Sequence, residues 1–181
     1  MIALLATLSL AHAETVAYAS LSGGLGFLRE NMGDFAVGAE HRLGEHHGLL
    51  LEGTLIHVHG NPTHATTRGV QAGYRYHIGH AFVGVVGGYE LGHAKYFTAE
   101  HGGPYYHYGL KHKSLIPHIG YRWGLGERGA LSSRVGAGYG AWEVRADEQG
   151  AEVEAAQQRV EDRIQTGPVK LDLELSIGLR F

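Results

Sequence analysis

The stretch VKLDLELSIGLRF, which ends the chain, constrains the fold more than any other segment. Its odd-numbered positions are all apolar, and its even-numbered positions are charged or small, among them Lys170, Asp172, Glu174 and Arg180. Alternation with period two is typical of a β-strand whose two faces meet different surroundings. The same pattern, separated by glycine-rich turns, predicts eight strands at about 16–28, 34–44, 48–59, 67–78, 81–96, 106–125, 130–145 and 167–181.

Composition limits the classes of function that this chain can have. It contains no cysteine, so disulfides and thiolate metal sites are excluded. A formal net charge of −3 argues against general affinity for nucleic acid. With 29 glycines and only 4 prolines, the chain is better suited to strands and tight turns than to disorder.

The first thirteen residues have the pattern of a secretory signal peptide. An apolar run over residues 2–10 precedes Ala11-His12-Ala13, the small-x-small sequence that signal peptidase cleaves. The mature domain is then expected to cover 14–181. No basic residue precedes the run, which leaves the true start codon open, and the alternative is a buried N-terminal strand. The run is too short for a spanning helix, which needs about 20 residues.

The connections between the strands alternate in length after the first one. Those after the second, fourth and sixth segments are tight, and those after the third, fifth and seventh are longer. This alternation favours a transmembrane up-and-down antiparallel β-barrel of eight strands. In the last long connection, AEVEAAQQRVEDRI has apolar residues at helical spacing and predicts one short amphipathic helix. The helix is interpreted as a solvated lid over the barrel mouth, or as a docking site for a partner.

The alternation alone does not show which face points outward. A soluble barrel of the lipocalin kind would bury the apolar face. The polar face, however, carries many glycines, such as Gly84, Gly88 and Gly92 in one segment. The narrow lumen of an eight-stranded barrel requires small side chains, whereas an exposed surface does not. We therefore expect the apolar face to point outward, while the facing of the segments at 16–28 and 48–59 stays open.

With this orientation, charged side chains of both signs fall inside the barrel. They are expected to pair with one another, because an unpaired charge away from water is costly. The predicted lumen network seals the barrel, and the alternative is that it forms a narrow ion or proton path. The network consists of Glu40, Arg42, Glu52, Gln71, Arg75, Glu90, Arg122, Arg134, Lys170, Asp172, Glu174 and Arg180. Outside, an aromatic girdle near the tight turns is predicted at Tyr74, Tyr76, Tyr121 and Trp123.

These features together resemble the small outer-membrane barrel proteins of Gram-negative bacteria, such as the OmpA transmembrane domain, OmpX and the opacity-type proteins. The resemblance covers the mature chain and includes the terminal Leu179-Arg180-Phe181. It implies an integral outer-membrane location with both termini in the periplasm, and Phe181 as a signal for the barrel assembly machinery. It implies no cofactor, because it includes no active-site motif.

Basic residues of the outward face gather toward the long-loop end of the barrel. They are expected at the height of the outer headgroups, where lipopolysaccharide phosphates would pair with them. Ordinary rim lysines that extend toward water are the alternative. The predicted lipopolysaccharide-binding residues are Arg68, Lys95, Lys111, Lys113 and Arg145.

Two weaker motifs suggest other chemistry. His57, His59 and His64 have side chains that could surround a transition metal, but polar histidines that line the rim and respond to pH are the favoured interpretation. His112 and Ser114 resemble the His-x-Ser pair of the PagL-type lipid A deacylases. Both have inward parity, whereas the site of that family faces lipid.

Three functions follow from the sequence. The favoured one is a non-enzymatic outer-membrane barrel that displays loops for adhesion or for a surface or host protein partner, and that contacts lipopolysaccharide. The alternatives are a lipid A-modifying enzyme and a narrow pore for ions or small solutes.

Overall fold

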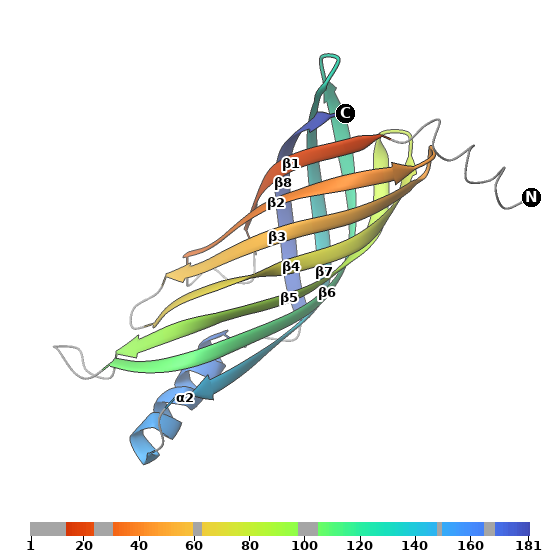
Figure 1. Cartoon of the computed structure of the whole chain (residues 1–181). Coiled ribbons are helices and arrows are strands. Elements are labelled where there is room, and N and C mark those ends of the chain that lie inside the picture. The colour runs from red at the N-terminus through yellow and green to blue at the C-terminus, as the bar shows by residue number, and fades with distance from the viewer. Residues whose placement is uncertain (1–13, 24–30, 60–62, 98–104, 148–149, 165–168) are drawn as a thin grey trace, which may run out of the picture.

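The chain forms one closed antiparallel barrel in which each strand pairs with its sequence neighbours and the last strand pairs with the first (Figure 1). The computed structural model describes residues 14–23, 31–59, 63–97, 105–147, 150–164 and 169–181. The elements are β1 (Thr15–Gly23), β2 (Asn31–Leu43), β3 (His47–His59), β4 (Thr63–Ile78), β5 (Ala81–Phe97), β6 (Tyr105–Leu125), β7 (Gly129–Ala146), α2 (Ala151–Ile164) and β8 (Val169–Arg180). The predicted eight-stranded up-and-down barrel with one short helix is confirmed.

The observed strand bounds differ from the predicted ones mainly at the helix end of the barrel. β4 begins at Thr63 instead of 67, and β2 begins at Asn31 instead of 34. Apart from Met32, these extra residues are polar or small, and they lack the alternation on which the prediction rests, although they pair with the neighbouring strand. The first strand is described only to Gly23, and the expected continuation to 28 lies outside the described residues, as does the expected signal peptide at 1–13.

Three tight turns gather at the end of the barrel that also holds the C-terminus. Each contains a glycine with positive φ: Gly44 at 79°, Gly79 at 62° and Gly126 at 66°. Glycine adopts this left-handed conformation without steric cost, which explains why these turns are short. At the same end, the backbones of Thr15 and Phe181 exchange two hydrogen bonds that close the seam between β1 and β8.

The apolar face of the strands points outward, as the glycine distribution predicts. On β8, Leu175 and Ile177 are exposed, while Asp172 and Glu174 are buried. β1 and β3, whose facing the sequence left open, obey the same rule, but β3 has leucines on both faces because Leu50 joins a small apolar cluster inside the lumen.

Aromatic side chains bound the apolar outer wall on two levels. Near the tight turns, Tyr121 and Trp123 contact each other with ring centroids 4.9 Å apart, and Tyr74 and Tyr76 lie on β4, two strands away. Farther from the turns, Tyr89 on β5 and Tyr139 on β7 are exposed. On β4 to β7, the outward side chains between the two levels include Val70, Ala72, Val83, Val85, Leu115, Pro117, Ile119, Val135 and Ala137.

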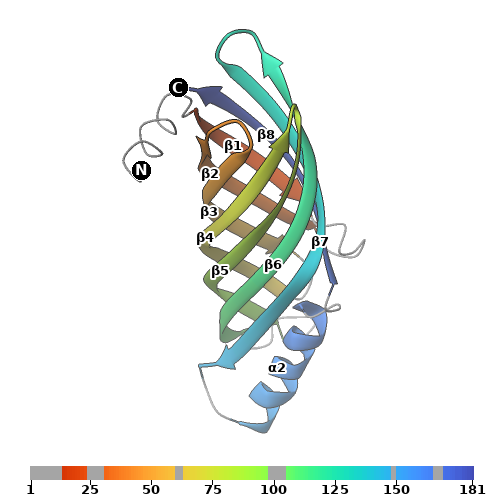
Figure 2. The same ribbon diagram turned by 90° about the vertical axis from the view of Figure 1, so that its right-hand side faces the viewer.

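Beyond the second aromatic level, the polarity of the two faces is reversed. β4 to β7 are the longest strands, and they extend toward α2, which packs against this end of the barrel (Figure 2). Here lysine, arginine and histidine predominate among the outward residues, which also include Leu91 and Glu143. Tyr96, Tyr108 and Leu110 point inward and are buried. Within the described residues, no helix is long and apolar enough to cross a bilayer.

Gly120 offers a test of how tightly the lumen is packed. An added Cβ would lie 2.2 Å from the ring of Phe82 and 2.4 Å from the carbonyl oxygen of Ser133. We expect Gly120→Ala to lower the free energy of unfolding by about 1–3 kcal/mol, as measured by chemical denaturation of the refolded protein. Gly53→Ala is the matched control, because the nearest atom to its added Cβ is 3.9 Å away. Equal stability of the two variants would contradict this packing.

Candidate functional site

The part of the lumen beside the tight turns is organised around the carboxylate of Glu40. One of its oxygens accepts hydrogen bonds from Arg75 Nη1 over 2.7 Å and from Arg122 Nη2 over 2.6 Å, and the other lies 2.5 Å from His77 Nε2. All four side chains are buried. The Arg75 guanidinium also lies over the ring of Phe82, 4.5 Å from its centroid. The charges of this layer are therefore paired and shielded from water.

A second ionic layer surrounds Arg134. Its guanidinium lies 2.6 Å from Glu174, 3.2 Å from Asp172 and 3.5 Å from Glu52, measured between the nearest nitrogen and oxygen atoms. The hydroxyl of Tyr18 donates a hydrogen bond to Glu52 over 2.7 Å. These side chains come from β1, β3, β7 and β8, so this layer connects both sides of the closing seam.

A third polar layer is centred on Glu90 of β5. Its carboxylate contacts His112 Nδ1 and accepts hydrogen bonds from Gln71 Nε2 over 3.2 Å and from Thr54 Oγ1 over 3.4 Å. The His112 ring stacks on Trp142, with centroids 4.2 Å apart. Histidine, glutamine and threonine take the place of arginine here, and the lumen becomes less charged toward the helix.

An apolar plug closes the barrel beyond these layers. Tyr108 is fully buried and its hydroxyl donates a hydrogen bond to the carbonyl of Val153 in α2 over 3.2 Å, while Gln157 of the helix donates to the carbonyl of Val144 in β7 over 3.0 Å. The plug consists of Ile56, Ala65, Ala94, Tyr96, Tyr108, Leu110, Val144, Val153, Ala156 and Val160. The apolar side of α2 thus packs against the inward-facing residues at this end of the barrel. Sequence reasoning missed this plug, although the inward parity of Tyr96, Tyr108 and Leu110 was a visible signal.

Three members of the predicted lumen network lie elsewhere or are not described. Arg42 and Arg180 are partly exposed at the tight-turn rim, and each lies 3.3 Å from the carboxylate of Glu14. Both arginines were expected among the paired charges inside the lumen. They pair instead with Glu14 at the edge of the barrel. The side chain of Lys170 lies outside the described residues.

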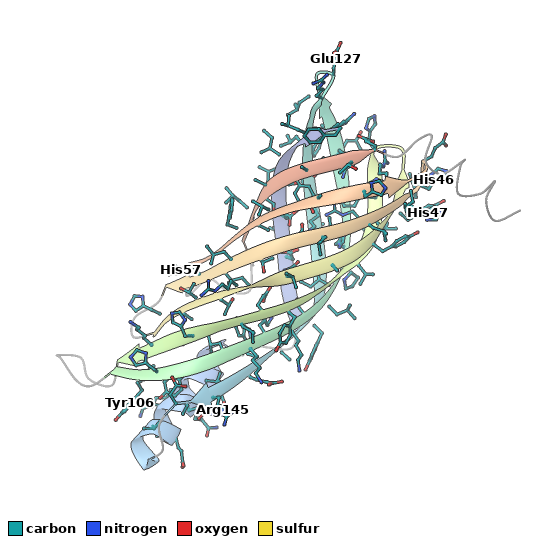
Figure 3. All side chains as sticks on the ribbon, in the orientation of Figure 1. His46, His47, His57, Tyr106, Glu127 and Arg145 are labelled. Atoms are coloured by element: carbon teal, nitrogen blue, oxygen red, sulfur yellow. The ribbon has the colours of Figure 1, made fainter. Side chains whose placement is uncertain are left out.

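His112 and Ser114, the pair that resembles a deacylase motif, are both buried inside the barrel. The acid beside His112 is Glu90, on the neighbouring strand, whereas Glu127 lies in a turn at the opposite end of the barrel (Figure 3). A molecule on the outside of the barrel would reach these two side chains only by passing through the wall.

The three histidines considered for a metal do not form a described metal site. His57 is exposed, and its Nδ1 lies 2.9 Å from the hydroxyl of Thr66. His64 is directly opposite His59 in the strand register, but the side chain of His59 is outside the described set. In the part of the chain that the structure describes, no group of three or more potential ligands is arranged to hold a metal ion.

The basic side chains that the sequence singled out share the outer face of four neighbouring strands. All five are exposed, and together they are called the basic face: Arg68 on β4, Lys95 on β5, Lys111 and Lys113 on β6, and Arg145 on β7. Lys113 lies ten residues from Trp123 along β6. At about 2.5 Å of height per residue in a tilted strand, these ten residues span about 25 Å, the height of the apolar band of a membrane barrel.

One acidic side chain interrupts the basic face. Glu143 of β7 accepts a hydrogen bond from Lys113 Nζ over 3.1 Å, and its second oxygen lies 3.7 Å from Lys111 Nζ. It lies four residues beyond Tyr139, outside the apolar band. The hydrogen bond from Lys113, with the charges of Lys113 and Lys111, lowers the pKa of the Glu143 carboxyl below its ordinary value. The two ammonium groups are therefore close enough to share one anion.

The ionic layer around Glu40 can be tested by removing its charge. Glu40→Gln leaves the guanidinium groups of Arg75 and Arg122 buried without their shared counter-charge, and we expect a loss of about 3–5 kcal/mol in the free energy of unfolding. Glu143→Gln is the control, because it breaks an exposed pair that water already screens, and it should leave stability nearly unchanged. If chemical denaturation gives both variants the stability of the wild type, the layer does not hold the barrel together.

No protein-family model matches the sequence, and no curated protein is significantly similar to it. Solved structures do match in fold. The N-terminal β-barrel domain of OprF from Pseudomonas aeruginosa aligns with a TM-score of 0.52 at 10% identity, covering 93% of this chain and 97% of that one.

Two further structures show the same architecture. A major outer membrane protein from Thermus thermophilus gives a TM-score of 0.56 at 14% identity, over 94% of this chain and 100% of that one. The attachment invasion locus protein Ail of Yersinia pestis, solved in complex with the heparin analogue sucrose octasulfate, gives 0.51 at 14% identity, over 93% and 97%. The chain therefore has the fold of the small eight-stranded outer-membrane barrel proteins.

Proposed function

We propose that this chain is a non-enzymatic, integral outer-membrane barrel whose basic face binds lipopolysaccharide in the outer leaflet. The observation that carries the proposal is the position of the basic face, directly beyond an apolar wall of membrane height. A soluble barrel would gain nothing from an exposed belt of leucine and valine, whereas hydrocarbon accommodates it. The similarity in fold to three outer-membrane barrels supports the location.

The proposal fixes the orientation of the barrel in the membrane. The tight turns, Phe181 and the girdle that includes Trp123 face the periplasm, and α2 lies on the cell surface. Short periplasmic turns and longer external connections are the rule for barrels of this kind. In the same proposal, residues 1–13 are a signal peptide and Phe181 is presented to the barrel assembly machinery.

The chemistry of the basic face fits phosphate groups. Phosphates form charge-assisted hydrogen bonds with clustered ammonium and guanidinium groups. Lys111 and Lys113 already share the carboxylate of Glu143, and a phosphate with greater charge can replace that exposed partner. Ail, which has the same fold, was solved with a polyanionic saccharide, so a barrel of this architecture can present a surface for clustered negative groups.

The lumen supports a closed barrel without enzymatic activity. Three polar layers with paired charges and the apolar plug fill the described interior in succession, and His112 and Ser114 are enclosed among them. The connections at 24–30, 60–62 and 98–104, which would meet a surface or host protein partner in this proposal, lie outside the described residues.

The central test replaces three lysines of the basic face. We expect K95Q/K111Q/K113Q to retain roughly a tenth or less of the lipopolysaccharide that co-purifies with the wild-type protein, because three charge-assisted contacts are lost. Lipid A is quantified by mass spectrometry after extraction from the folded protein. K95R/K111R/K113R keeps the charge and should retain binding. Unchanged co-purification by the glutamine variant would remove the proposal.

The closed lumen makes a separate prediction. Wild-type protein in planar lipid bilayers should show no steady single-channel conductance, because an eight-stranded lumen has room only for its own side chains. A steady conductance that disappears in Arg134→Gln or Glu174→Gln would show that ions pass through the ionic layers, and would favour the pore alternative.

A further inference from the structure

Four histidines share the outer wall with the basic face, and the proposed binding of phosphate does not explain them. His57, His93 and His107 are exposed, and His64 is half-buried. They lie on four consecutive strands, β3, β5, β6 and β4 respectively, and all four face outward beyond the second aromatic level. Figure 3 shows His57 at the helix end of the barrel, far from His46 and His47 at the turns.

The strand register places these histidines among the fixed cations. Lys95 of β5 is directly opposite His64 of β4 on one side and His107 of β6 on the other. In the next row toward the membrane, Gly109 separates His93 from Arg145. Residues directly opposite on one face of a sheet have Cβ atoms about 4.5–5.5 Å apart, so His64 and His107 are the immediate neighbours of Lys95 on its two sides.

The charged groups around the histidines are mostly positive. The neighbouring strands contribute two acids: Glu143, which lies between the two lysines of β6, and Asp147, opposite His107 at the end of β7. The other charged or titratable residues at positions next to the histidines on adjacent strands are His59, Arg68, Lys95, Lys111 and Arg145. A proton added to an imidazole here therefore meets more cations than anions.

This arrangement couples proton binding to anion binding. Imidazole in water changes its charge near pH 6.5. Protonation on either side of Lys95 places like charges directly opposite each other, which is unfavourable in a sheet. A bound anion with several negative groups removes that cost and thereby favours the protonated rings. By linkage, protonated rings strengthen anion binding to the same extent, so the affinity for the anion increases on acidification.

We infer that His57, His64, His93 and His107 form, with Lys95 and Arg145, a second tier of the basic face that takes up protons when it binds the phosphorylated saccharide of lipopolysaccharide. The inference rests on the proposed function and adds a regulated subsite to it. The first tier consists of Arg68, Lys111 and Lys113 and binds anions at any pH. The second tier adds affinity for the anion when the pH falls.

The test uses sucrose octasulfate, because sulfate esters keep their charge over the pH range and any protons taken up must bind to the protein. Folded protein in a zwitterionic detergent is titrated calorimetrically at pH 7.5 and 5.5 in low salt, and in two buffers of different ionisation enthalpy, which gives the number of protons bound. We expect roughly tenfold tighter binding at pH 5.5, with a net proton uptake.

The variant H57Q/H64Q/H93Q/H107Q should bind equally at both pH values and take up no protons. H46Q/H47Q/H80Q is the matched control, since it removes three histidines from the tight-turn end and should behave as the wild type. Heat-dependent electrophoretic mobility verifies that each variant is folded. The inference is overturned if the wild type binds no octasulfate or takes up no protons, if the first variant keeps the pH dependence, or if the control loses it.

The outcome is separable from that of the proposed function. Loss of lipopolysaccharide from K95Q/K111Q/K113Q at pH 7.5, together with a pH-independent affinity of the wild type, sustains the function and removes the second tier alone. Full retention of lipopolysaccharide by that variant removes the function itself.

Discussion

The narrow lumen is the constraint on which the rest of the structure depends. Eight strands enclose just enough space for side chains, so every charged group that points inward must find its partner there. Glu40 with two arginines, and Arg134 with three carboxylates, meet this requirement by contacts across the barrel. The glycines follow from the same lack of space: an added Cβ at Gly48 would lie 2.6 Å from the carboxylate of Glu40.

Along its axis, the barrel has two cores of opposite construction. Where the wall is apolar outside, the interior holds the ionic layers and the small apolar cluster that includes Leu50. Toward the helix end, where the outer side chains become basic, the interior becomes hydrophobic and is covered by α2. The first arrangement suits hydrocarbon, and the second is that of an ordinary protein in water. The same alternation of inward and outward positions serves both regions, because only the residue types change at the boundary.

Most of the fold could be predicted from the sequence, because period-two alternation sets strand type, number and facing at once. The helix was equally readable from the spacing of Val153 and Val160. The inward parity of Tyr96 and Tyr108 was a signal for the plug, but it could be interpreted only once distant strands and the helix were known to meet. The pairing of His112 with Glu90 likewise depends on register, which alternation does not determine to the residue. Outward parity located the basic face, but its pairing with Glu143 required the register as well.

The two flanks of the barrel differ in the charge of their outer surfaces, because among the described residues only the longer strands carry outward lysines and arginines. The lysines and arginines of the basic face all lie on the flank built by β4 to β7. On the opposite flank, the described outward residues of β8, β1 and β2 include no lysine, arginine, aspartate or glutamate. In the proposed membrane, charged saccharides would gather along the flank built by β4 to β7. The opposite flank would present a mostly apolar surface to neighbouring proteins and lipids.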